Sequence, residues 1–105
     1  MRDAANTRHL TEESVRLLAT GKDEIKHRLL TTYTQRFQYV FPEDVPESIR
    51  PHVISVRQLL NKEPTYTGQS TTESALYRMH RTTAATIAAD IFEIYIALGR
   101  TGNQD

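Results

Sequence analysis

Four histidines and no cysteine set the range of chemistry open to this 105-residue chain. Without cysteine there is no disulfide framework, no thiolate nucleophile and no cysteine-based zinc site. No two histidines stand four residues apart, so a metal ion would need ligands gathered from distant segments. We therefore expect no metal site. For His80 we expect a partly buried side chain at a helix junction, satisfied by a backbone carbonyl group.

Asp90 and Glu93 are three residues apart on a predicted helix, so they lie on one helix surface. A pair of carboxylates can act as acid and base, but these two are better explained as the solvated edge of an apolar helix or as partners of an arginine. Gly21-Lys22 lacks the glycine pattern and the preceding strand of a phosphate loop. No Gly-x-Ser-x-Gly motif and no cofactor motif occurs. The sequence therefore predicts no cofactor and favours a protein that is not an enzyme.

Two small clusters of basic residues could contact a nucleic-acid backbone, the second of them beside Tyr77. Thirteen Lys and Arg balance thirteen Asp and Glu, whereas a nucleic-acid-binding protein usually carries an excess of basic residues. An ordinary solvated face is thus the simpler interpretation, and a small nucleic-acid-binding regulator is kept as the alternative function. The candidate residues for it are Lys22, Lys26, Arg28, Arg78 and Arg81.

The spacing of apolar residues predicts an all-α bundle of four to five helices in one domain, residues 10–99. Residues 1–9 are expected to be disordered. A first helix is expected after the N-cap Thr11 and up to about Thr20, a second from residue 23 to 39, and a third from Pro51 to Asn61. The predicted core comprises Val15, Leu18, Ile25, Leu29, Leu30, Tyr33, Phe37, Val40, Ile49, Val53, Val56, Leu60, Leu76, Ile87, Ile91, Ile94 and Leu98.

Gly21 lies between the first two helices, as in a helix-turn-helix motif. The second helix, however, carries large aromatic residues to its end, which suits a strut of a bundle better than a recognition helix.

Residues 63–72 form a linker rich in hydroxyl residues, with Pro64 and Gly68. The following segment, 72–98, is predicted either as one helix or as two helices joined near Arg81-Thr82, and we favour two. Gly99 is expected to end the last helix, and residues 100–105 to form a polar tail.

The last helix, about 83–98, is apolar on nearly every side and is expected to be central. One apolar stripe includes Ile87, Ile91 and Ile94, and a second lies on roughly the opposite side. If the other helices leave this second stripe uncovered, it is an interface with a second copy or with a helical protein partner. The candidate interaction residues are Ala85, Ala89, Phe92 and Ile96.

No run approaches the roughly 20 consecutive apolar residues of a membrane-spanning helix, and residues 1–7 do not resemble a signal peptide. We therefore expect no membrane insertion and a cytoplasmic location. The function predicted from sequence is a small soluble helical protein-interaction module that self-associates as a dimer.

Overall fold

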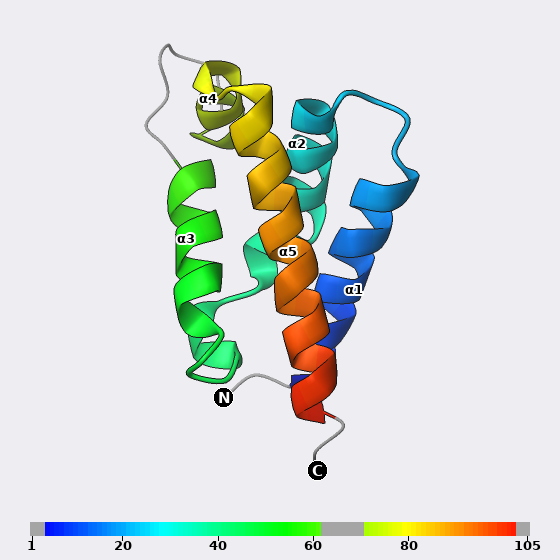
Figure 1. Ribbon diagram of the computed structural model, residues 1–105, viewed down its shortest axis with the longest axis vertical. Helices are drawn as coiled ribbons and strands as arrows, with labels where there is room; N and C mark the ends of the chain where they lie inside the picture. The colour runs from blue at the N-terminus through cyan, green and yellow to red at the C-terminus, as the bar shows by residue number, and fades with distance from the viewer. Residues whose placement is uncertain (1–3, 62–70, 103–105) are drawn as a thin grey trace.

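The computed structural model describes residues 4–61 and 71–102, which form five α-helices, two short 3-10 turns and no strand. The elements in chain order are α1 (Ala4–Thr20), α2 (Ile25–Gln35), η1 (Phe37–Tyr39), η2 (Pro42–Asp44), α3 (Arg50–Leu60), α4 (Thr71–Arg78) and α5 (Arg81–Gly102). The predicted all-α bundle is confirmed (Figure 1).

Helix α5 is the central helix of the bundle. In Figure 1 it runs along the front of the molecule between α1 and α3, and it contacts both of them as well as α2. Its buried side is the predicted first stripe, which comprises Ala84, Ile87, Ile91, Ile94 and Leu98. The apolar residues on the opposite side of α5 do not enter this core.

Every residue of the predicted core is buried or packs against the buried cluster. Val15, Ile25 and Leu30 are the partly buried members. Each large apolar side chain that is fully buried contributes about 1.5–3 kcal/mol relative to leaving it exposed. Val45 and Ala75 are also buried but were not predicted, because neither lies in a long periodic stripe.

Helix α1 packs through small hydroxyl residues as well as through Leu10, Val15 and Leu18. Thr7, Thr11 and Ser14 are buried. The Thr11 hydroxyl donates a 2.8 Å hydrogen bond to the Thr7 carbonyl oxygen, and the Ser14 hydroxyl donates one of 2.8 Å to the Leu10 carbonyl oxygen. Because these hydroxyls are satisfied within their own helix, they can be buried at little cost.

The start of α1 corrects one prediction. The expected disorder over residues 1–9 is wrong for residues 4–9, which are helical; residues 1–3 lie outside the described part of the chain. The cause is tertiary: Thr7 is buried, so the turns before Thr11 belong to the bundle. Thr11 accordingly lies inside α1 and is not its N-cap.

Helix α2 also differs from its predicted bounds. It ends at Gln35, and the chain then tightens into η1. Phe37 nevertheless remains fully buried, so the periodic stripe continues through the 3-10 turn.

The segment after the linker forms two helices, as we favoured. The break falls at Met79-His80, where the His80 carbonyl oxygen accepts the first hydrogen bond of α5, 3.0 Å from Ala84 N. His80 is exposed, so the expectation of a partly buried histidine is wrong.

Two predictions on chain ends also change. Helix α5 continues through Gly99 to Gly102, so Gly99 does not end it. Of the predicted polar tail, residues 100–102 belong to this helix, and residues 103–105 lie outside the described residues. Of the predicted linker, residues 63–70 lie outside the described residues, and α4 begins at Thr71.

Candidate protein-interaction surface

The described residues of the chain leave most of the second apolar stripe of α5 uncovered. Ala85 and Ala89 are exposed, Phe92 retains 47% of its accessible surface, and Ile96 is half-buried. The structure therefore places all four predicted interaction residues on one continuous side of α5, pointing away from the buried ridge.

Phe92 differs from the other large apolar and aromatic side chains that are exposed among the described residues. Those are Tyr39, Ile54 and Tyr77. The two tyrosines carry a hydroxyl that water can solvate, and single exposed apolar residues such as Ile54 are normal on protein surfaces. Phe92 has no polar group and lies among exposed alanines. It is thus the centre of an apolar patch rather than an isolated exposed residue.

A groove extends this patch from α5 onto α1. It has a volume of about 220 Å³ and is lined mostly by apolar side chains: Val15, Leu18, Ala19, Ile25, Arg28, Ala88 and Phe92. We call the combined surface the α1/α5 face and define it as Val15, Ala19, Ala85, Ala88, Ala89, Phe92 and Ile96. The contribution of α1 to it was missed from sequence, where Val15 was assigned to the core. The four-residue spacing of Val15 and Ala19, to one side of the ridge formed by Thr11 and Leu18, was the available signal.

The turn between α1 and α2 holds this groove together. Arg28 Nη1 donates a 2.9 Å hydrogen bond to the Leu18 carbonyl oxygen in the last turn of α1. Gly21 allows this approach, since a Cβ atom there would lie 2.7 Å from both Cγ and Cδ of Arg28. Arg28 is therefore a structural residue at the base of the groove, and its guanidinium group does not project freely into solvent.

A charged row borders the α1 side of the face. Arg16 and Glu12 are one helical turn apart, with Nη2 and Oε1 separated by 3.9 Å. Their side chains are 66% and 51% exposed, so the pair is loose and accessible to solvent. An exposed pair of this kind contributes little to folding, and both side chains remain free to change partners.

The five basic residues of the alternative prediction lie in the α1–α2 turn, the first turns of α2, the end of α4 and the start of α5, which all lie toward the upper end of the bundle in Figure 1. An ion pair of 2.9 Å between Arg81 Nε and Glu24 Oε1 joins the α1–α2 turn to the start of α5. Arg78 Nη2 donates a 2.9 Å hydrogen bond to Ser74 Oγ. With Arg28 also occupied, only Lys22 and Lys26 of this set have no hydrogen bond or ion pair to the described residues. The result is a surface of mixed charge rather than a continuous basic one.

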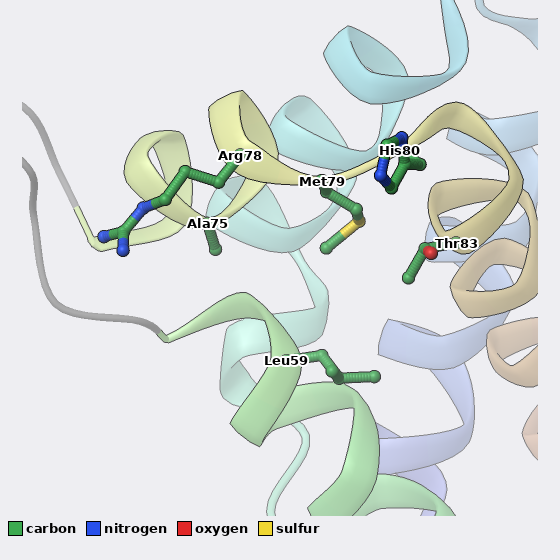
Figure 2. Close-up of a pocket in the computed structure, with 6 residues that line it drawn as sticks. All are labelled: Leu59, Ala75, Arg78, Met79, His80 and Thr83. Atoms are coloured by element: carbon green, nitrogen blue, oxygen red, sulfur yellow. The ribbon is translucent and has the colours of Figure 1, made fainter.

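A pocket of about 330 Å³ lies where α3, α4 and the start of α5 meet (Figure 2). Leu59, Ala75 and Met79 give it an apolar lining, with His80 and Thr83 at one side. Figure 2 shows the guanidinium group of Arg78 directed away from the other five side chains. Among the described residues, the lining has no carboxylate that could orient His80 as a general base. Within residues 4–61 and 71–102, no group of three or more potential metal ligands comes together.

Helix α5 has a further property that the count of consecutive apolar residues did not reveal. Its segment 81–99 is long and apolar enough to cross a membrane, judged by length and composition, with a mean hydropathy of 1.3. In the bundle, 28% of that segment is buried. The apolar character of α5 is thus divided between the ridge in the core and the exposed stripe.

The fold defines the class as a small five-helix bundle with one half-exposed apolar face. Comparison with protein-family models, with curated proteins and with solved structures finds no match for this chain.

Proposed function

We propose that this chain is a small soluble helical module that binds protein, and that it self-associates as a dimer through the α1/α5 face. The observation that carries the proposal is the 47% exposure of Phe92 among Ala85, Ala88 and Ala89. In a monomer the aromatic ring of Phe92 remains exposed to water. An interface that covers it gains about 25 cal/mol for each Å² of apolar surface removed from solvent.

The residue sizes on this face suit a helix as the partner. Alanines at 85 and 89 are one turn apart and let a second helix approach to about 8 Å between axes. Phe92 supplies a large aromatic anchor next to this close contact. Aromatic residues at the centre of an interface commonly carry most of the binding free energy.

Protein binding explains this stripe better than membrane insertion does. Glu93 is exposed and Asp90 is half-buried, and both lie near the middle of the segment that is long enough to span a membrane. A carboxylate at the centre of a membrane-spanning helix costs about 2.5–3.5 kcal/mol. At the edge of a protein interface the same groups stay hydrated. A cytoplasmic location, consistent with the absence of cysteine, belongs to the same proposal.

Light scattering coupled to size-exclusion chromatography tests the proposal. The wild-type chain should change from monomer to dimer as its concentration rises through the micromolar range. Ala89→Arg should leave it monomeric, because a long charged side chain would be forced into the contact between helices. Ala89 is exposed, so the substitution should not unfold the monomer.

Gln58→Arg is the matched control, since it adds the same charge at an exposed position on α3. This variant should dimerise like the wild type. A wild-type chain that stays monomeric at high concentration would refute self-association.

Nucleic-acid binding is the weaker candidate, because three of its five predicted residues already bind protein groups. A filter-binding assay at low salt separates the two functions. Salt-sensitive binding that Lys22→Ala and Lys26→Ala abolish would favour the nucleic-acid role.

A further inference from the structure

The row of charges on α1 suggests how the second copy is oriented. Glu12 and Arg16 are four residues apart, which is about 6 Å along the helix. They are opposite in sign, and both are exposed. In a dimer with a two-fold axis, when the first residue of such a pair contacts the second residue in the other copy, the reverse contact forms as well. Such a pair is therefore complementary to itself when two copies of α1 lie antiparallel.

The Glu12–Arg16 pair lies at the same height along the bundle as the apolar patch on α5. Val15 lies between Glu12 and Arg16 in sequence and lines the same groove as Ala88 and Phe92. Because α1 and α5 run in opposite directions (Figure 1), an axis that crosses α1 midway between Glu12 and Arg16 crosses α5 close to Phe92. The apolar and the charged parts of the surface therefore fit one axis.

We infer that the partner on the α1/α5 face is a second copy, packed antiparallel about a two-fold axis near Phe92, with Glu12 of each copy facing Arg16 of the other. This inference rests on the proposed self-association and adds its geometry. In this arrangement α5 packs on α5 and α1 lies alongside α1. The two Phe92 side chains lie close to the axis, Ala89 of each copy faces Ile96 of the other, and the two intermolecular ion pairs form at the rim.

Charge complementarity favours a second copy over an unrelated partner. The chain has a formal net charge of zero, so two copies approach without overall repulsion. The border of the face carries one acid and one base at matched spacing, rather than a block of one sign that would call for an oppositely charged protein.

Two single charge reversals provide the test. Glu12→Arg gives a row with two cations, and Arg16→Glu gives a row with two anions. Each variant alone should dimerise about three- to tenfold more weakly than the wild type at low salt, because like charges then face each other. Mixed one to one, the two variants should form a heterodimer in preference to either homodimer, since both facing pairs become attractive.

Native mass spectrometry reads out this mixture when one variant carries a mass tag. The double variant with both reversals should recover the wild-type dimer, which shows that the single variants are folded and impaired only in pairing. Glu43→Arg, at an exposed position on η2, is the control. When it is mixed with either charge-reversal variant, it should show no preference for forming a heterodimer with one over the other. Raising the salt concentration should reduce the preference for the heterodimer.

Three outcomes distinguish the parts of the argument. A heterodimer preference and a recovered double variant support the antiparallel arrangement. A wild-type dimer that Ala89→Arg disrupts but that shows no preference in the mixture overturns this arrangement and leaves self-association intact. A wild-type monomer, or one that binds only a different protein through Phe92, overturns both the arrangement and self-association.

Discussion

Arg28 reaches from α2 to the end of α1, where its Nη1 donates a 2.9 Å hydrogen bond to the carbonyl oxygen of Leu18. The carbonyl groups in the last turn of a helix have no partner within that helix, so a guanidinium group there satisfies one of them and complements the helix dipole. The contact fixes the position of α1 relative to α2. It thereby holds Val15 and Ala19 beside Phe92, across the groove that forms the apolar face.

Replacing Arg28 with alanine should lower the free energy of unfolding by about 1.5–3 kcal/mol, the usual contribution of a hydrogen bond to a charged group. Urea unfolding followed by circular dichroism measures it. Lys22→Ala is the control, because Lys22 is exposed in the turn between α1 and α2, and it should change stability by less than about 0.5 kcal/mol. Equal losses in the two variants would show that the contact with Leu18 contributes nothing specific.

Replacing Gly21 with alanine should destabilise the fold by about 1–3 kcal/mol, because the new Cβ atom would lie 2.7 Å from Cγ and Cδ of Arg28. A double-mutant cycle identifies the cause. In the Arg28→Ala background, Gly21→Ala should cost much less, since the two closest atoms are gone and only the Leu17 carbonyl oxygen remains, at 3.1 Å. Additive losses would mean that Gly21 acts through its backbone and not through space for Arg28.

Replacing Thr32 with valine should leave stability unchanged or raise it by up to about 1 kcal/mol. Thr32 is fully buried, and its hydroxyl has no hydrogen-bond partner in the described residues. Valine keeps the shape and removes the cost of burying that polar group. Thr32→Ala removes the methyl group as well and should be destabilising. A loss of more than about 1 kcal/mol in the valine variant would reveal a partner for the hydroxyl.

Ile91 and Phe92 are neighbours in sequence with opposite roles, which a matched pair of alanine variants should separate. Ile91 is fully buried, so Ile91→Ala should cost about 2–5 kcal/mol of folding stability. Phe92→Ala should affect the fold much less but weaken dimerisation by about 2 kcal/mol or more, as expected for an aromatic anchor. Unfolding curves and sedimentation equilibrium measure the two effects. Unchanged dimerisation in Phe92→Ala would remove this residue from the interface.

The core could be predicted from sequence because it depends on local periodicity. Tyr33 and Phe37, or Ile87, Ile91 and Ile94, recur at helical spacing and face one direction wherever the helix is placed. The side of each helix that carries these residues must be buried if so much apolar surface is to be removed from water. The identity of the helices and of their inner sides therefore followed from the order of residues alone.

The bounds of the elements depended on contacts that sequence spacing does not encode. Helix α1 begins at Ala4 because Thr7 packs in the bundle, although no large apolar residue marks those turns. The role of Arg28 was likewise missed, because a basic residue beside Lys26 and His27 reads as part of a solvated cluster. Its long side chain instead folds back onto the end of the preceding helix.

The sequence by itself determined that the last helix has two apolar stripes, because composition and period alone establish that. Only the tertiary structure decided which stripe is covered. The ridge from Ala84 to Leu98 meets α1, α2 and α3, and these helices leave the side with Ala89 and Phe92 in water. The physical reason is geometric: a helix can be apolar all round, but its neighbours in one small chain enclose only part of its circumference.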